Sequence, residues 1–323
     1  MSNRPYHPPF LLRNGHIQTF LASSSLRAWG PNAMQASARA EMVTSDAGVR
    51  LLGFRSWLQA PRRKGLVVLL HGWEGSSDST YIRRTGRSLY QRGYEVFRLN
   101  LRDHGPTQHL NPGLFFATSL DEVFDAVRRV LLESHKLPAF LVGFSLGANF
   151  ALRIAVRCRC RPIPNLRHVV AISPVLDPEE STRRADRHPL IRRYFLKKWR
   201  RSLALKQRLF PHRYDFSAVI GSRTIRQTTN LILERYSEFP STRDYFDAYT
   251  LTGTRLKELF VPATLLTSAD DPIIPVRGFH ELQLNPTTSL IIYRHGGHIG
   301  FLEGPGLRSR YENDLPSLFD RWT

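Results

Sequence analysis

Short apolar runs rich in Val, Leu and Ile recur along the chain, separated by longer polar and amphipathic stretches. They occupy residues 66–70, 94–99, 140–142, 168–172, 263–267 and 289–293. Continuous apolar runs of this length predict strands that are buried on both faces, as in a parallel sheet covered by helices.

Amphipathic helices are predicted between these strands. In segment 119–134, apolar residues recur at three- and four-residue spacing, and Thr118 or Ser119 can serve as the N-cap. The members of this apolar face are Leu120, Val123, Val127, Val130 and Leu131. The alternation of strands and helices predicts an α/β fold with a doubly wound, mostly parallel sheet.

The alternation stops between Asp177 and about Lys257, where no strand pattern occurs and aromatic and basic residues crowd together. This pattern favours a helical insertion between two strands of the sheet. We therefore expect four parts, listed in chain order: an N-terminal extension at 1–40, the first part of the core at 41–176, a helical cap or lid insertion at 177–257, and the second part of the core at 258–323.

Composition narrows the class of protein. The chain has 323 residues, of which 41% are hydrophobic and 23% charged, and this is typical of a globular protein rather than a disordered one. Its two cysteines, Cys158 and Cys160, lie too close together to staple a fold, so we expect free thiols and a reducing compartment. A signal-peptide pattern and an apolar run of 18 residues are both missing, and a cytoplasmic location is the expectation.

Positive charge is concentrated in one segment. The chain carries 46 Lys+Arg and 27 Asp+Glu, a net charge of +19, and residues 183–213 hold twelve basic residues against the single acid Asp186. A helix over 190–210 is predicted to have an apolar face comprising Ile191, Phe195, Trp199, Leu203, Leu209 and Phe210, and a basic face comprising Arg193, Lys197, Arg200, Arg201 and Arg208. Three interpretations stay open: a core-packed helix with a solvated basic face, a lid over the active site, or a surface that docks on anionic membrane. No nucleic-acid motif accompanies the charge, so nucleic acid is not an expected partner.

The strongest chemical signal is the string Gly143-Phe144-Ser145-Leu146-Gly147, which directly follows the predicted strand 140–142 and precedes a predicted helix. G-x-S-x-G between a strand and a helix is the nucleophile elbow, in which a tight turn exposes the serine hydroxyl. The glycines are needed because side chains at 143 and 147 would collide with neighbouring backbone. Ser145 is therefore the predicted nucleophile.

Strand 66–70 leads into His71-Gly72-Trp73-Glu74-Gly75. The backbone after this strand is expected to lie beside the nucleophile turn. The amide groups of Trp73 and Leu146 are the predicted oxyanion donors, each contributing about 3–4 kcal/mol to the transition state. His71 is interpreted as a structural residue that holds the loop.

The acid and the base are predicted in loops that follow later strands. Asp271 is the predicted triad acid, and Asp270 is the competitor. In the Gly-rich loop after the last strand, His298 is the predicted general base and His295 is the alternative. A metal site at the two histidines lacks an evident third ligand. The chain order Ser145, Asp271, His298 is that of the α/β-hydrolases.

With these residues identified, the chain resembles the YheT-like branch of the α/β-hydrolases, the fourth AB-hydrolase family. Five strings carry the resemblance: residues 12–19 (LRNGHIQT), 70–75 (LHGWEG), 143–149 (GFSLGAN), 269–272 (ADDP) and 295–301 (HGGHIGF). The N-terminal string is the most specific of them. The resemblance implies a serine carboxylesterase or an acylglycerol- or phospholipid-active hydrolase, with Ser145, Asp271 and His298 in the triad roles.

We therefore expect an enzyme that cleaves carboxylic esters of small molecules or lipids through an acyl-enzyme, without a cofactor. Three alternatives stay open: a thioester or amide hydrolase on the same triad, a peripheral membrane lipase that docks through its basic lid, and a non-enzymatic binding member of the fold. The oligomeric state is not predicted.

Overall fold

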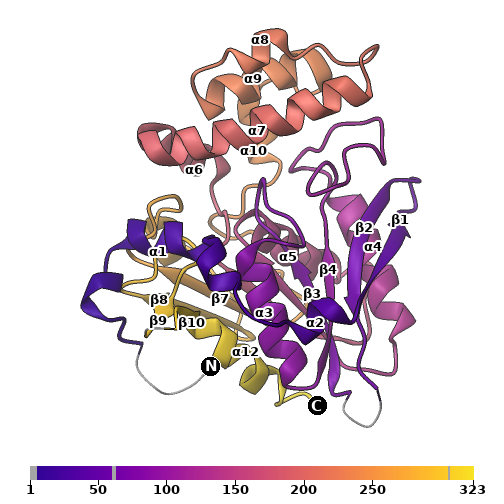
Figure 1. Ribbon diagram of the computed structural model, residues 1–323, viewed down its shortest axis with the longest axis vertical. Helices are drawn as coiled ribbons and strands as arrows, with labels where there is room; N and C mark the ends of the chain where they lie inside the picture. The colour runs from indigo at the N-terminus through magenta and orange to yellow at the C-terminus, as the bar shows by residue number, and fades with distance from the viewer. Residues whose placement is uncertain (1–5, 60–62, 305) are drawn as a thin grey trace.

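The computed structural model describes residues 6–59, 63–304 and 306–323. Within these residues, eight strands form one sheet in the order β1-β2-β4-β3-β5-β6-β7-β8 (Figure 1). Strands β3 to β8 are mutually parallel, whereas β1 and β2 form an antiparallel hairpin at one edge. The strands are β1 (Ala38–Thr44), β2 (Arg50–Ser56), β3 (Gly65–Leu70), β4 (Tyr94–Leu99), β5 (Ala139–Phe144), β6 (Leu166–Ile172), β7 (Ala263–Ser268) and β8 (Thr288–Tyr293).

The predicted α/β class with a mostly parallel sheet is confirmed. The six predicted apolar runs form β3 to β8, and β3, β4, β5 and β7 are buried along their whole length. The hairpin β1–β2 has no such run: β1 has a single buried residue, Val43, and most of β2 alternates between buried and more exposed positions. The fully buried side chains of β2 include Arg55, which pairs with Glu41 and Glu133.

Helices cover both faces of the sheet. On one face, α3 (Thr80–Gln91) and α12 (Arg310–Phe319) contribute to an apolar cluster that includes Val67 and Phe140. On the other face, α4 (Leu120–Glu133) and α5 (Leu146–Arg157) pack with Val68 and Leu141. Helix α4 matches the predicted helix; Ser119 stands at its N-cap position, although its side chain makes no capping hydrogen bond.

The remaining short elements lie near the ends of the chain or in loops. They are η1 (Phe10–Leu12), α1 (Gly15–Ala22), η2 (Ser25–Ala28), α2 (Ala33–Ala36), α11 (Arg277–His280), β9 (Leu302–Glu303) and β10 (Arg308–Ser309).

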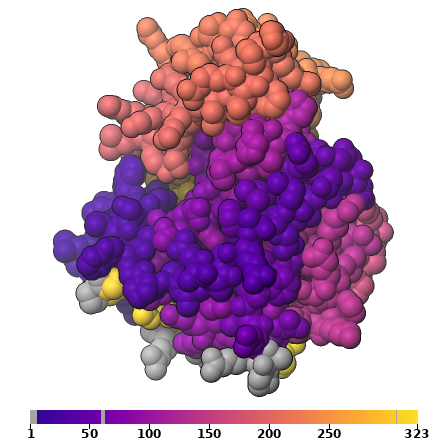
Figure 2. Space-filling model, turned by 45° about the vertical axis from the view of Figure 1, so that its right-hand side comes forward, coloured from indigo at the N-terminus to yellow at the C-terminus, as the bar shows by residue number. Residues whose placement is uncertain are grey.

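A group of helices separates β6 from β7 in the sequence and lies above the sheet as a distinct lobe (Figures 1 and 2). We call these helices the helical insertion: α6 (Pro178–Arg187), α7 (Pro189–Leu209), α8 (Ser217–Ile220), α9 (Ile225–Tyr236) and α10 (Thr242–Asp247).

The predicted helix in the basic segment is α7. Ile191 and Leu203 on its apolar face are buried, and Phe195 and Trp199 contact the ring of Trp73 at centroid distances of 5.1 and 4.9 Å. The prediction is wrong for Leu209, which is 41% exposed: it follows Leu203 by six residues, a spacing that turns it away from the apolar face.

Candidate active site

Ser145 occupies a tight turn between β5 and α5. Its φ of +54° is a backbone conformation that residues other than glycine rarely adopt. Both flanking glycines are required sterically: a Cβ at Gly143 would lie 2.2 Å from the carbonyl oxygen of Gly147, and a Cβ at Gly147 would lie 2.4 Å from those of Leu70 and His71. The serine is therefore held at the carboxyl edge of the sheet, as the G-x-S-x-G motif predicts.

His298 and Asp271 meet Ser145 at this edge. The ring of His298 lies in the loop after β8, with Nε2 2.9 Å from Ser145 Oγ and Nδ1 2.8 Å from Asp271 Oδ2. The other oxygen of the Asp271 carboxylate accepts hydrogen bonds from the amides of Ile273 and Ile274 at 2.8 and 2.9 Å. A fully buried carboxylate thus orients the imidazole, and the imidazole is within hydrogen-bond reach of the hydroxyl.

The neighbouring pair, Asp270 and His295, lies apart from this chain of hydrogen bonds. Asp270 Oδ1 accepts from the amide of Gly297 at 2.9 Å, and its Oδ2 is 3.6 Å from His295 Nδ1. The structure therefore brings Asp271 rather than Asp270 to His298. In the part of the chain that the structure describes, there is also no group of three or more His, Cys, Asp or Glu side chains that suits a metal ion.

His71 holds the loop after β3. Its Nε2 accepts a hydrogen bond from the amide of Leu101 at 3.1 Å, so Nδ1 carries the proton and donates to the carbonyl oxygen of Gly72 at 2.8 Å. Burial, reinforced by the charges of His104 and Lys198, holds the pKa of His71 well below its usual range. The ring is thus neutral and engaged on both nitrogens, which suits the predicted structural role.

The loop held by His71 lies directly against the serine. A Cβ placed on Gly72 would lie only 3.1 Å from the Cβ of Ser145. Trp73 follows in this loop, and Leu146 is the first residue of α5, whose first amides have no acceptor within the helix. Trp73, Leu146 and Ser145 line the same cavity.

The string at residues 12–19 has a structural role that sequence reasoning did not identify. Asn14 caps α1 by accepting hydrogen bonds from the amides of His16 and Ile17 at 2.9 and 3.2 Å. Gly15 packs so closely on the Asp270 loop that a Cβ there would lie 2.2 Å from the carbonyl oxygen of Asp270. Helix α1 therefore lies directly on the loops that carry the acid and the base.

Two polar side chains of α1 bind the loop of His298. Thr19 Oγ1 accepts from the amide of His298 at 2.8 Å and donates to the carbonyl oxygen of Gly15 at 2.6 Å. The buried Gln18 accepts from the amide of Leu302 at 2.7 Å. The sequence marked this string as the most specific part of the family resemblance. Its contacts join residues about 280 positions apart, so only the tertiary structure shows them.

Two cavities reach Ser145. The first has a volume of about 160 Å³ and extends beneath the helical insertion, with mainly apolar walls such as Leu114, Phe116 and Ile232. The second has a volume of about 410 Å³ and lies between α1, the loop after β3 and α7. His298 lines the second cavity only, whereas Trp73 and Ser145 line both.

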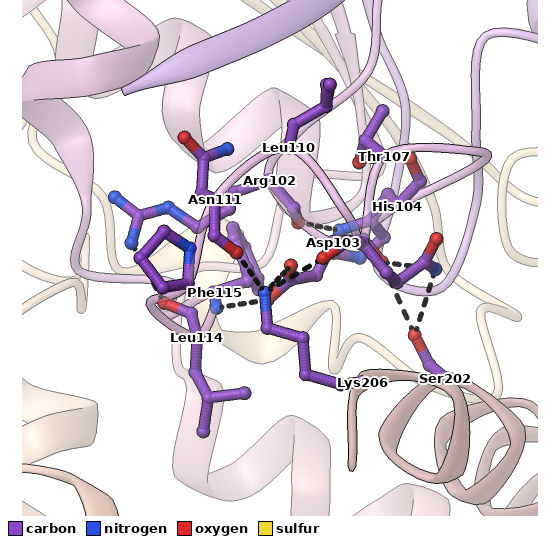
Figure 3. A network of polar contacts seen from close by, with 12 residues as sticks. Arg102, Asp103, His104, Thr107, Leu110, Asn111, Leu114, Phe115, Ser202 and Lys206 are labelled. Atoms are coloured by element: carbon purple, nitrogen blue, oxygen red, sulfur yellow. Dashed lines mark hydrogen bonds and ion pairs between the residues drawn. The ribbon is translucent and has the colours of Figure 1, made fainter. Parts of the chain in front are cut away.

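A buried ion pair ties α7 to the core beside the first cavity (Figure 3). Lys206 Nζ donates to Asp103 Oδ1 at 2.7 Å and to the carbonyl oxygens of Asn111 at 2.7 Å and Gln108 at 3.2 Å. Asp103 Oδ2 accepts from the amide of Phe115 at 2.8 Å. Burial raises the pKa of Asp103 and lowers that of Lys206, and the opposite charge of each partner counters the shift.

Fold and site together define the class. A parallel sheet with a strained serine in a strand–turn–helix, and with an acid and a histidine after later strands, is the architecture of the α/β hydrolases. Residues 67–308 match the model of the alpha/beta hydrolase family, so the chain belongs to this family.

Individual relatives are similar over most of the chain. The esterase-named protein slr0264 of Synechocystis is 27% identical over 93% of this chain and 88% of its own, and the esterase-named YheT of Escherichia coli is 22% identical over 77% and 75%. A Bos taurus protein named phospholipase ABHD3 is 24% identical over 74% of this chain and 58% of its own.

Solved structures share the fold at lower identity. The Pyrococcus furiosus esterase Pf2001 superposes with a TM-score of 0.57 at 16% identity, over 91% of this chain and 96% of that chain. A soluble variant of monoglyceride lipase from Saccharomyces cerevisiae superposes with a TM-score of 0.56 at 17% identity, over 91% and 99%.

The sequence predicted free thiols at the two cysteines and contained no apolar run long enough to span a membrane. Cys158 is buried and Cys160 is exposed, and both are free thiols. Among the helices of the described ranges, none is long and apolar enough to span a bilayer.

Proposed function

We propose that this chain is a serine hydrolase that cleaves carboxylic esters through an acyl-enzyme. One observation carries the proposal: an unbroken chain of hydrogen bonds runs from Asp271 through His298 to Ser145, at the wall of two cavities. The esterase and phospholipase names of several relatives support the same class of reaction.

The first half of the reaction forms the acyl-enzyme. Ser145 Oγ attacks the carbonyl carbon of the ester while His298 Nε2 takes the hydroxyl proton, and the carboxylate of Asp271 stabilises the resulting imidazolium. The amides of Trp73 and Leu146 are the proposed donors to the oxyanion. Collapse breaks the bond between the acyl carbon and the alcohol oxygen, and His298 returns its proton to that oxygen, releasing the alcohol.

The second half restores the enzyme. His298 takes a proton from water, and the resulting hydroxide attacks the acyl carbon. Collapse releases the carboxylic acid, and the proton on His298 returns to Ser145 Oγ. Each step uses groups of the chain and water alone, so the proposal needs no cofactor.

Active-site labelling tests the proposal. The full chain is incubated with a fluorophosphonate probe and assayed on p-nitrophenyl esters of graded chain length, with a thioester and an amide of the same acyl group alongside. We expect Ser145→Ala to lose labelling and at least about 10⁴-fold of ester turnover. The exposed Ser217 on α8 provides the matched control, Ser217→Ala. Absence of labelling in the folded, unaltered chain would favour a binding protein, and faster turnover of the thioester or amide would change the substrate class.

A second candidate, action on lipid at an anionic membrane, is favoured by the surface around the second cavity. Ile17 and Phe20 of α1 are each 44% exposed, and Leu190 and Tyr194 of α7 are 63% and 40% exposed. We call these four residues the apolar rim. Phe20 and Tyr194 line the cavity, and the neighbouring rings of His16 and His188 lie 4.3 Å apart, so the two segments are adjacent.

Positive charge accompanies the apolar rim. Arg193 and Lys197 are exposed and, at three- and four-residue spacing, share a face of α7 with Leu190 and Tyr194. Apolar side chains surrounded by basic ones are typical of surfaces that bind anionic lipid headgroups. We propose that the apolar rim docks on such a surface and presents the second cavity to it.

A further inference from the structure

Glu74 stands where the two cavities meet. It follows Trp73 in the loop after β3, and it lines both cavities, as Ser145 does. Its φ of +54° is rare for a residue with a side chain, and its carbonyl oxygen accepts a hydrogen bond from Lys198 Nζ of α7 at 2.8 Å. Lys198 thus ties the backbone of Glu74 to α7, at a position that lines the same cavities as Ser145.

The carboxyl group of Glu74 has no hydrogen bond or ion pair to any residue that the structure describes. Burial raises its pKa to about 7; the charge of Lys198 lowers the pKa and that of Asp103 raises it. Glu74 is partly buried and lines both cavities. An acid that is held without a partner at the wall of a cavity, with a raised pKa, is typical of sites that bind a ligand.

The position of His298 indicates which part of the ester each cavity would hold. If the proposed function holds, His298 protonates the leaving alcohol, so the alcohol part of the ester must lie on the side of the imidazole. His298 lines the second cavity and not the first. The acyl chain then occupies the first, mainly apolar cavity, and the alcohol occupies the second.

The walls of the second cavity are polar on the side of the loop after β3. Ser76, Ser79, Thr80 and Tyr81 line it there, and Lys198 lines it from α7. Asp78 also lines this cavity, but it is paired with Arg98 at 2.9 Å. The charge of Lys198 acts on Glu74, so the walls that the structure describes carry no unpaired negative charge that would select a cationic alcohol such as choline. These walls fit a small neutral alcohol that carries hydroxyl groups of its own.

We propose that Glu74 is a specificity-determining residue, whose carboxylate accepts a hydrogen bond from a free hydroxyl of the alcohol part of the substrate. The substrate class is an ester between an apolar acid and a small neutral polyol, of which a glycerol monoester is the simplest probe. The inference rests on the proposed function, since it assigns the two cavities by the reaction.

A matched pair of substrates tests the proposal. The full chain hydrolyses glycerol monohexanoate and methyl hexanoate, which share the acyl group and differ only in the alcohol. We expect Glu74→Ala to lower kcat/KM for the glycerol ester at least about tenfold, mainly through KM, and to change it for the methyl ester less than about twofold. Glu74→Gln should fall between, because an amide oxygen still accepts a hydrogen bond. Glu281→Gln, at an exposed residue of the loop after α11, is the control.

The pH dependence provides a second measurement. Taking the ratio of kcat/KM for the two esters cancels the titration of His298, which both reactions need. The charged groups that act on Glu74 are Lys198 from α7 and Asp103 from the loop after β4. With a pKa of about 7, the carboxylate forms as the pH rises from 6 to 8, so the preference for the glycerol ester should rise over that range in the unaltered chain and stay flat in Glu74→Gln.

The possible outcomes distinguish a failure of the proposed role of Glu74 from a failure of the proposed esterase function. An equal loss on both esters in Glu74→Ala, or an unchanged preference, would overturn the role of Glu74 while leaving the esterase proposal intact. A preference of the unaltered chain for choline hexanoate over the glycerol ester would overturn the substrate class. Hydrolysis of none of these esters would overturn the proposed function and the inference with it.

Discussion

At the scale of single residues, the hydroxyl of Thr19 links α1 to the loop of the proposed base. It accepts a hydrogen bond from the amide of His298 and donates one to the carbonyl oxygen of Gly15, so it acts as both acceptor and donor. His298 is followed by Ile299, whose φ of +57° makes this loop depend on outside contacts for its shape. A residue far from the nucleophile in sequence therefore contributes to the geometry of the imidazole.

Thr19→Val keeps the shape of the side chain and removes both hydrogen bonds. The amide of His298 then lacks its acceptor, and the imidazole loses part of its fixed position relative to Ser145. We expect kcat on p-nitrophenyl esters to fall about tenfold with little change in KM. Thr19→Ser, which keeps the hydroxyl, should recover most of the rate. Equal kinetics in the valine and serine variants would contradict a role for the hydroxyl.

Residue-level features were readable from the sequence where they depend on local structure. The glycines of the elbow were expected to be sterically required, and the contacts of Gly143 and Gly147 confirm this expectation. The sequence favoured Asp271 as the partner of His298 but did not exclude Asp270, because adjacent residues of one loop differ only in direction. The fold orients Asp271 toward the imidazole and Asp270 toward Gly297.

At the scale of elements, helix α7 joins the helical insertion to the core. Its apolar face was predictable from helical spacing, but Lys206 on that face is buried and binds Asp103. Spacing alone does not tell a buried lysine from a solvated one, because the distinction depends on a loop nearly 100 residues earlier in the chain. The hairpin β1–β2 escaped prediction for a similar reason: its stability comes from pairing with β4 rather than from a continuous apolar run.

Lys206→Met tests the anchoring of α7. The substitution keeps most of the apolar stem but leaves the carboxylate of Asp103 buried without its counter-charge. We expect the free energy of unfolding in urea to fall by about 3–5 kcal/mol. Lys197→Met, at an exposed position of the same helix, should change it by less than about 0.5 kcal/mol. Adding Asp103→Asn to Lys206→Met should restore part of the loss, and equal stability of the two single variants would contradict the anchoring role.

At the scale of the whole molecule, charge and apolar exposure meet at the mouth of the second cavity. The net charge is +19, and the basic segment includes α7, which carries half of the apolar rim. The sequence indicated a docking surface on α7 as one of three interpretations. The participation of α1 was not predictable, because only the fold brings residues 17–20 beside residues 190–194.

Sedimentation with vesicles tests docking. We expect the full chain to bind vesicles of phosphatidylcholine with 30% phosphatidylglycerol at low salt, and to lose most of this binding at about 0.5 M salt because the charges are screened. Phe20→Ser combined with Leu190→Ser should weaken binding several-fold at low salt. Phe260→Ser is the control, since Phe260 is 59% exposed but precedes β7. It therefore lies at the amino ends of the parallel strands, whereas the cavity lies at their carboxyl ends. Binding that is absent at low salt, or equally weakened by the control, would remove the docking candidate.

The sequence by itself determined the parallel sheet, the elbow at Ser145 and the chain order of the acid and the histidine. These features follow from local causes: apolar runs that form buried strands, and glycines that permit a tight turn. Tertiary structure alone decided between Asp271 and its competitor Asp270, gave the loop of His298 the support of Thr19, placed Glu74 at the wall of both cavities and buried Lys206. Each of these depends on contacts between segments far apart in the chain, and only the closed fold determines which groups lose water and which find a partner.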